Sequence, residues 1–380
     1  MALPVYRYQI ADLATNRILE DVRLTGVSFN KPLNGSGRFD ATWKLGAKTR
    51  HLDAYDLTMP TRRCIYAWRD DRPMWGGIIW TRKYSSTSQT VTIGAGEWWS
   101  YFDHRAVLPL LPASPGIFDL AGLAAPSYAG IDQNQIARNL VALAQSHTGG
   151  DIGIRLDLDT TTSGQLRDRT YPPYKLSNAG EMLRNLTGVI GGQDMVFDVA
   201  ASSTGAAAPD RVLLQGTPWL GQQGSSHVWE LTGSATSYEW DSDGTRMATR
   251  AYAVGEGVDL GTPIAVSEDS SKYAIGFPLL ELDTSYDGDD PDVLGAHAQG
   301  DQEAARLPVV LPRFVVRGDV PPTAADVSRG DDGRLIIPAG DLFHRRGWDG
   351  PVRVVDIKYS PSASAERLEI TAAPMLDDVA

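Results

Sequence analysis

The densest group of side chains able to bind a metal ion lies in residues 283–292, Asp-Thr-Ser-Tyr-Asp-Gly-Asp-Asp-Pro-Asp. Carboxylate oxygens are the ligands that calcium prefers. The spacing differs from that of the twelve-residue EF-hand loop, and no Glu stands at its closing position. A calcium site and a solvated acidic loop both remain open, and we assign no metal ligand. The five aspartates are Asp283, Asp287, Asp289, Asp290 and Asp292.

Histidine and cysteine offer little further chemistry. The sequence has six histidines, far apart and without an HExxH motif or a Cys/His pair, so we expect structural or surface roles for them. Cys64 is the single cysteine and lies in a strand-like run, which favours a small buried apolar residue. A nucleophile would need a neighbouring base, which the sequence alone does not reveal. The histidines are His51, His104, His147, His227, His297 and His344.

Two short motifs have both a structural and a functional interpretation. Arg317-Gly318-Asp319 spells an adhesion tripeptide but is typical of a turn that ends a strand. Trp98-Trp99 could bind a sugar, although a core or interface role is favoured. Asp and Glu are abundant enough to supply the carboxylate pair of a glycosidase, yet no pair stands out. We therefore assign no catalytic residue and no cofactor.

The composition indicates a folded, acidic protein. With 380 residues the chain should form about two to four domains. Hydrophobic residues make up 42% and charged residues 22%, an ordinary folded composition, and 38 Gly and 23 Pro favour many short strands. The net charge of −12 disfavours a protein that grips phosphates, so sequence-specific DNA binding is not expected. DNA could still pass without being held.

The sequence predicts no interaction with a membrane. No stretch approaches the roughly 18–20 apolar residues of a membrane span. The first residues alternate apolar and polar side chains, unlike a signal peptide. We therefore expect the protein to be made and folded in a cytoplasm.

Residues 1–110 predict a β-domain. Strands are expected at 39–45, 65–68 and 74–80, the last continuing into a hairpin that returns near residue 93. The paired glycines Gly76-Gly77 indicate a bulge or a close approach of two backbones.

Residues 111–200 predict a small α/β insertion. Asp132 and Gln135 resemble a capping box, and apolar residues at helical spacing follow as far as Gly149. A second helix is expected from Ser177 to Gly191, followed by a strand at 195–197.

The remaining ranges, 201–308 and 309–380, are again mainly β. The first is expected to hold strands, the acidic loop and a helix from Asp292 to Leu307, which Pro308 ends. The second is expected to complete a second β-barrel.

Two segments near opposite ends of the chain echo each other. Residues 78–95 read Ile-Ile-Trp-Thr-Arg-Lys-Tyr-Ser, a polar turn and Val-Thr-Ile-Gly-Ala, and residues 354–373 read Val-Val-Asp-Ile-Lys-Tyr-Ser, a polar turn and Leu-Glu-Ile-Thr-Ala. Both predict long hairpins with Lys-Tyr-Ser at the same point. Chance similarity and a duplicated barrel both explain the echo. If the barrel is duplicated, a trimer would present six quasi-equivalent units and could dock onto a six-fold tube.

Residues 34–42 and 65–79 resemble the opening of siphophage minor tail proteins of the ReqiPepy6 gp37-like group, which is common in phages of actinobacteria. The family pattern is a glycine turn, a strand and then R-D-G-x-P-V-W-G-G-I-I. Asp71 replaces its central Gly and Met74 its Val, so the turn can differ in type while the strand pairing is expected to persist. The resemblance is specific over residues 22–100 and looser beyond.

The resemblance implies a mainly β fold with an α+β insertion: two hub-type β-barrel domains plus a small α/β insertion and helical segments. Residues 249–255 would open the second barrel, and residues 337–341 and 352–357 would close it. Such proteins are similar to the central hub of contractile tails. The implied protein is a structural, non-enzymatic hub in the virion tail tip.

The resemblance also implies partners. The chain would form a homotrimeric ring around the DNA channel, with the distal tail protein, the tape-measure protein and other tip proteins as neighbours. DNA would pass without specific binding. The acidic residues either line this channel or form a solvated surface, and the sequence leaves both open. The rival classes are a tail-associated cell-wall hydrolase or carbohydrate-binding module and, third, a secreted adhesin.

Overall fold

The computed structural model describes residues 4–111, 120, 122–189, 191–224, 227–286, 288–362 and 366–375. The chain divides into two compact units. We call Met1–Tyr238 with Phe314–Ala372 the main unit, and Glu239–Arg313 with Ala373–Ala380 the small unit. Each is described by itself.

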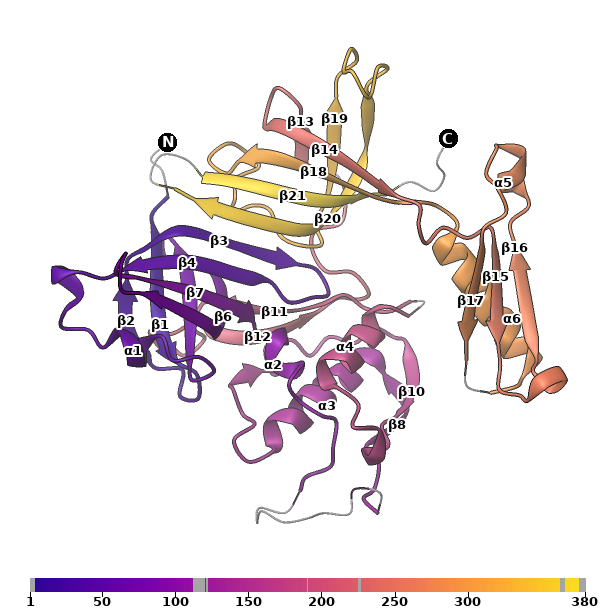
Figure 1. The fold of residues 1–380 in the computed structure, drawn as a ribbon, viewed down its shortest axis with the longest axis horizontal. Coiled ribbons are helices and arrows are strands. Elements are labelled where there is room, and N and C mark those ends of the chain that lie inside the picture. Colours follow the sequence, from indigo (N-terminus) through magenta and orange to yellow (C-terminus); the bar gives the residue numbers. More distant parts are fainter. Residues whose placement is uncertain are drawn as a thin grey trace. The chain divides into compact units, whose positions relative to one another are not determined.

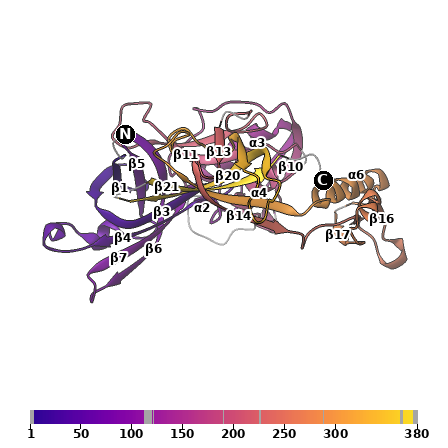
Figure 2. The ribbon, with the colours of Figure 1, turned by 90° about the horizontal axis from the view of Figure 1, so that it is seen from above.

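A large sheet of thirteen strands dominates the main unit (Figures 1 and 2). Three of its strands, β14, β18 and the last residues of β21, continue into the small unit. The strands are β1 (Tyr6–Asp12), β2 (Ile18–Val22), β3 (Leu24–Pro32), β4 (Arg38–Lys44), β5 (Arg63–Arg69), β6 (Arg72–Ser85), β7 (Thr90–Glu97), β13 (His227–Glu230), β14 (Ala235–Asp243), β18 (Val309–Arg317), β19 (Asp332–Ile337), β20 (Trp348–Pro361) and β21 (Glu366–Pro374).

The sheet repeats one arrangement twice. In the first half the spatial order is β3-β4-β7-β6-β5-β1, and in the second half it is β14-β18-β21-β20-β19-β13. The order along the chain is also the same in the two halves. One pair differs, because β1 runs antiparallel to β5 whereas β13 runs parallel to β19. The predicted hairpins at 78–95 and 354–373 are confirmed as β6–β7 and β20–β21, and they occupy equivalent places.

Aromatic packing repeats along with the strands. In β4, Phe39 is buried and its ring lies 6.1 Å from that of Tyr8 in β1. In β18, Phe314 is buried and its ring lies 5.1 Å from that of Trp229 in β13. Each phenylalanine follows an arginine, Arg38 or Arg313. Matching contacts from equivalent strands support a duplication over chance similarity.

The insertion between the two halves covers one side of the first half with helices. Its elements are α2 (Trp99–Phe102), β8 (Ser127–Asp132), α3 (Gln133–Ser146), β9 (Ile154–Arg155), β10 (Leu166–Thr170), α4 (Ala179–Thr187), β11 (Met195–Ala200) and β12 (Asp210–Gln215). The apolar faces of α3 and α4 share one core with β5, β6 and β11. The fold contains the predicted α/β insertion, although its elements extend from Trp99 to Gln215, beyond the predicted residues 111–200. Both helices end a few residues before the predicted glycines.

Local sequence explains how α3 begins. The carboxylate of Asp132 accepts a hydrogen bond from Asn134 N at 2.9 Å, so it caps the helix as predicted. Gln135 instead bonds Asn139 and Arg138, so its side chain does not return to the helix start as in a capping box. The close backbone approach predicted for Gly76-Gly77 is confirmed at Gly77, because a Cβ there would collide with the carbonyl oxygen of Gly96.

The small unit has a much smaller core. It contains β15 (Arg250–Val254), β16 (Ile264–Glu268), α5 (Ser271–Ala274), β17 (Glu281–Ser285) and α6 (Pro291–Ala305), with sheet order β16-β15-β17. Its buried apolar cluster consists of Ala253, Leu294 and Ala298, with Ala265 and Tyr286 packed against it. The helix predicted from Asp292 is confirmed as α6.

The mainly β prediction is confirmed, but the barrels differ from expectation. The path through the described strands runs from β14 to β2 as an open sheet, and no closed barrel is found among them. Residues 249–255 do not open a second barrel, because β15 pairs with β16 and β17 in the small unit. Residues 337–341 and 352–357 fall at the end of β19 and within β20.

Candidate functional site

The acidic loop is partly absorbed into secondary structure. Asp283 lies in β17, and Asp290 caps α6 by accepting from Asp292 N at 2.9 Å. Asp287 lies outside the described residues. Within the described part of the chain, no group of three or more His, Cys, Asp or Glu side chains is arranged to hold a metal ion.

Cys64 lies in a buried polar cluster at the centre of the main unit. Its side chain is fully buried and Sγ lies 3.3 Å from Arg211 Nη2. Burial raises the pKa of the thiol despite this cation. Arg211 also donates to Tyr66 Oη at 2.8 Å and to Leu13 O at 2.7 Å, which ties the insertion to the first half. The buried-core interpretation of Cys64 is therefore confirmed.

The tryptophan pair and the adhesion-like triplet are structural. Trp98 and Trp99 are both fully buried, and Trp99 Nε1 donates to Gly180 O at 3.1 Å. In the triplet, Arg317 and Asp319 pair with each other at 2.7 Å. A Cβ on Gly318 would lie 2.5 Å from Leu368, so the glycine permits a close turn after β18.

Most of the histidines have local partners. His227 Nε2 lies 3.3 Å from Asp331 Oδ2 in a buried position. His297 stacks on Tyr286 with ring centroids 4.0 Å apart, and His104 lies 4.6 Å from the ring of Trp80. These contacts support structural roles.

A buried carboxylate, Glu97, and a partly exposed one, Asp198, share one arginine where the two halves and the insertion meet. Arg329 Nη1 donates to Glu97 Oε2 at 3.0 Å, and its Nη2 lies 3.1 Å from Asp198 Oδ2. Lys31 Nζ lies 2.9 Å from Asp198. Burial raises the pKa of Glu97 to about 7, against the pull of Arg329. Burial acts on Asp198 as well, but Lys31 and Arg329 outweigh it and lower its pKa.

Carboxylates with opposite pKa shifts are also a pattern of acid–base catalysis. Here the geometry favours a structural cross-link. Glu97 is 1% exposed, and its Oε2 accepts from both Arg329 and Gly37 N, the latter at 2.8 Å. Arg329 further donates to the carbonyls of Pro32 and Phe197, each at 2.9 Å. The cluster therefore joins β3, β7 and β11 to the segment before β19.

One edge of β20 is filled by the first half. Residues 356–359, which we call the filled edge, pair antiparallel with β3, so that Tyr359 lies opposite Phe29. Tyr359 is 2% exposed and its ring centroid lies 4.9 Å from that of Phe29. A cavity of about 210 Å³ lies beside Tyr359. Near it, Arg72 of β6 in the first half donates a hydrogen bond to Ala325 O of the second half at 2.8 Å.

Among the described strands, none lies beside the equivalent edge of β6. β5 pairs with β6 only from Arg72 to Ile78, and among the described strands β7 alone flanks residues 81–84. We call residues 81–84 the open edge. Because Lys-Tyr-Ser recurs in both hairpins, Tyr84 is the counterpart of Tyr359. Tyr84 is 58% exposed, so the same position is buried in one half and solvated in the other.

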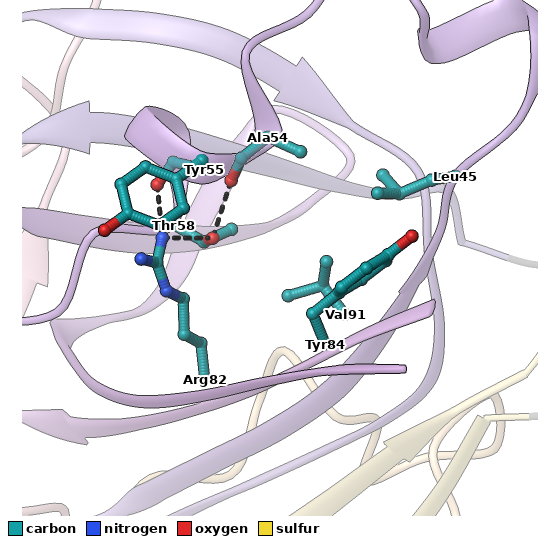
Figure 3. Close-up of a pocket in the computed structure, with 7 residues that line it drawn as sticks. All are labelled: Leu45, Ala54, Tyr55, Thr58, Arg82, Tyr84 and Val91. Carbon is teal, nitrogen blue, oxygen red and sulfur yellow. Dashed lines mark hydrogen bonds between the residues drawn. The ribbon is translucent and has the colours of Figure 1, made fainter. Parts of the chain in front are cut away.

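An apolar groove of about 280 Å³ runs along the open edge (Figure 3). We call it the tip groove. One wall is α1 (Ala54–Leu57), where the guanidinium of Arg82 lies 4.0 Å from the ring centroid of Tyr55. Arg82 also donates to Tyr55 O and, at 3.3 Å, to Thr58 Oγ1. Leu45, Tyr84 and Val91 complete the lining.

Charge is distributed unevenly along the chain. Residues 239–313 contain fifteen Asp and Glu but only five Lys and Arg. Residues 44–62 and 81–91, which surround the tip groove, contain six Lys and Arg but only two Asp. Within the part of the chain that is described, no helix is both long and apolar enough to cross a membrane.

Comparisons with known proteins identify the fold. No protein-family model and no curated protein sequence matches the chain. Among solved structures, it is similar to the 43 kDa tail protein of prophage MuSo2 from Shewanella oneidensis, with a TM-score of 0.60 and 12% identity over 97% of this chain and 98% of that one. It is also similar to the tail protein from Neisseria meningitidis MC58, with a TM-score of 0.58 and 11% identity over 96% of each chain.

A third match is the prophage tail protein gp18 from Listeria monocytogenes, with a TM-score of 0.53 and 12% identity over 98% of this chain and 95% of that one. The matches cover both units and the insertion. The chain therefore has the fold of phage tail proteins.

Sequence reasoning missed the features that distinguish the two halves. Arg211 and Arg329 lie in unremarkable stretches, and only the fold brings them to buried carbonyls and carboxylates. The recurrence of Lys-Tyr-Ser gave a reason to compare Tyr84 with Tyr359, but it carried no signal that one is buried and the other exposed.

Proposed function

We propose that this chain is a structural, non-catalytic subunit of a phage tail that forms a homotrimeric ring around the DNA channel. The observation that carries the proposal is the fold match with prophage tail proteins, which extends over 96% to 98% of the chain. A match of this extent includes both units and the insertion, which supports a structural role for the whole of the matched sequence.

The internal duplication supports the ring. Three chains, each with two equivalent six-stranded halves, present six quasi-equivalent units, so a trimer can adapt a three-fold tip to a six-fold tube. The buried clusters around Arg211 and Arg329 fix the two halves and the insertion against one another. Such cross-linking suits a subunit that withstands mechanical force within the tail.

The finer placement follows the resemblance described above. We place the ring in the tail tip of a siphophage virion, with the distal tail protein, the tape-measure protein and other tip proteins as neighbours. The net charge of −12 supports a channel through which DNA slides without specific binding.

Size-exclusion chromatography with light scattering tests the proposal on the purified full chain. We expect a species of three chain masses whose proportion rises with protein concentration. A chain that stays monomeric at every concentration, together with host-wall clearing that one Asp or Glu substitution abolishes, would replace the structural role with a hydrolytic one.

A further inference from the structure

The two halves of the sheet differ in one consequential way. The outer part of β20 is paired with β3, whereas the equivalent outer part of β6 is the open edge. At the other end of the same sheet, β14 has only β18 beside it among the described strands. By position in the repeat, β14 is the counterpart of β3. The chain therefore carries both an unpaired acceptor edge and the unpaired counterpart of the strand that fills such an edge.

We infer that β14 of one copy of this chain pairs antiparallel with the open edge of β6 in a second copy, as β3 pairs with β20 within one chain. The inference rests on the proposed function in that it requires copies of the chain to assemble. Because the two surfaces are different, the contact is heterologous and repeats around a ring. Edge-to-edge strand addition is a recurrent mode of recognition.

The repeat also fixes the register. The sequence Ser28-Phe29 before the β3–β4 turn matches Ser237-Tyr238 in β14. Phe29 lies opposite Tyr359, which is the counterpart of Tyr84. Tyr238 of one copy should therefore lie opposite Tyr84 of the next, and their rings would cover the tip groove as Phe29 covers Tyr359.

The same register brings opposite charges together. Asn30 lies opposite Lys358 within the chain, so the equivalent contact places Glu239 opposite Lys83. In the free chain Glu239 is exposed and shares Arg313 with Asp241, at 3.2 Å and 2.6 Å. Two carboxylates on one guanidinium leave a net negative charge on β14. Opposite charges directly across a strand pair stabilise it.

Exposed strand edges are otherwise a liability, because they template pairing with other chains. The open edge is flanked by apolar side chains at the tip groove, which pairing with β14 would remove from water. A second copy is the occupant that the repeat specifies, since it supplies the counterpart strand and the complementary charge.

Cysteine cross-linking between full-length chains tests the register. Lys83→Cys in one preparation and Glu239→Cys in another should give a disulfide-linked dimer when mixed under mild oxidation, and neither should do so alone. Side chains opposite one another in a sheet have Cβ atoms about 4.5–5.5 Å apart, close to the range of a disulfide. The native Cys64 is fully buried and present in every variant.

Lys358→Cys provides the matched control for Lys83→Cys, because Lys358 is the equivalent residue on the filled edge. It should not cross-link to Glu239→Cys. Equal yields from the two pairs would overturn the inference. A second outcome would also overturn the inference. It is that a chain carrying both Lys83→Cys and Glu239→Cys forms an intramolecular disulfide at high dilution, while the mixture of the two single variants forms no dimer.

Charge reversal distinguishes a failure of the proposed contact between β14 and the open edge from a failure of the trimer as such. Lys83→Glu should weaken association by roughly tenfold or more, and the double variant Lys83→Glu/Glu239→Lys should restore it. If the wild-type chain is a trimer and neither single reversal changes its association, the proposed function stands and this contact is wrong. If the wild type is monomeric and the cysteine pair does not react, both are wrong.

Discussion

The first and second halves of the main unit are built alike but completed differently. Strand order, hairpin lengths and the contact between an aromatic ring on the first strand and a phenylalanine correspond. Yet Tyr359 is 2% exposed under β3, whereas Tyr84 is 58% exposed beside the tip groove. One copy of the repeat therefore does not bury its own outer edge. Each half needs a strand from elsewhere to cover its outer edge, and one chain supplies only one.

Both halves contain a buried arginine that contacts two carboxylates. Arg329 contacts Glu97 and Asp198 where the two halves and the insertion meet, whereas Arg63 contacts Asp12 and Asp56 within the first half. The Arg329 cluster therefore helps to join the second half to the rest of the main unit, whereas the Arg63 pairs leave the open edge uncovered. The experiments below test this difference between the two edges.

Replacing the buried arginine should have the largest effect. We expect Arg329→Met to lower the free energy of unfolding by about 3–5 kcal/mol, because it leaves the buried carboxylate of Glu97 without its cation and leaves Asp198 with Lys31 as its remaining cation. Urea unfolding followed by tryptophan fluorescence measures it. Arg82→Met is the matched control at the open edge and should cost about 1 kcal/mol, the value of an exposed cation–π contact. Equal costs would show that the two edges are alike.

The equivalent tyrosines give the most direct comparison. Tyr359→Ala should cost about 3–5 kcal/mol, because it removes a buried ring stacked on Phe29. Tyr84→Ala should change the stability of the free chain by no more than about 0.5 kcal/mol, as expected for an exposed side chain. Both values come from urea titrations at a protein concentration where the chain is monomeric. A large loss for Tyr84→Ala would mean that its edge is already covered.

The junction of the halves should also make stability depend on pH. The pKa of Glu97 is about 7 in the folded chain, against an ordinary value of 4.5. Glu97 therefore binds its proton more tightly in the folded state than in the unfolded state. The resulting contribution to the free energy of unfolding is complete below about pH 4.5 and is lost as the pH rises through 7. We expect Glu97→Gln to flatten the fall in melting temperature across this window. A wild-type and variant difference that is constant with pH would contradict the assignment.

Removing one helix cap in each unit should have the smallest effects on stability, and the pair of variants compares the two units. Asp132→Ala removes the cap of α3 in the main unit and should cost about 1 kcal/mol of global stability. Asp290→Ala removes the cap of α6, whose unit has a core of three residues. It should speed amide exchange across residues 250–305 and leave the unfolding of the main unit unchanged. Uniform protection of both units would show that the small unit is more stable than its core suggests.

Much of the fold was predictable from local sequence. Alternating Phe39, Ala41 and Trp43 specify a strand with one buried face, and Asp132 specifies a helix start. The recurrence of Lys-Tyr-Ser predicted the two hairpins. The strand at 250–254 was assigned to the wrong sheet, because alternation shows that a strand has two faces and says nothing of its partner.

The candidate site was much less predictable. Tyr359 is buried by β3, which lies more than three hundred residues before it, whereas Tyr84 is exposed, although both stand in the same Lys-Tyr-Ser sequence. The arginine clusters depend likewise on long-range contacts, such as the one between Arg329 and Glu97. Such contacts depend on the order of the strands in the sheet, which local sequence does not reveal.

A cryo-EM map of the assembled tail would show both the ring and the contact between its copies. We expect three copies of the chain in a ring around the channel, with six similar sheet halves and β14 of each copy beside residues 81–84 of its neighbour. A tail that contains one copy, or three copies in which the open edge faces solvent, would contradict it.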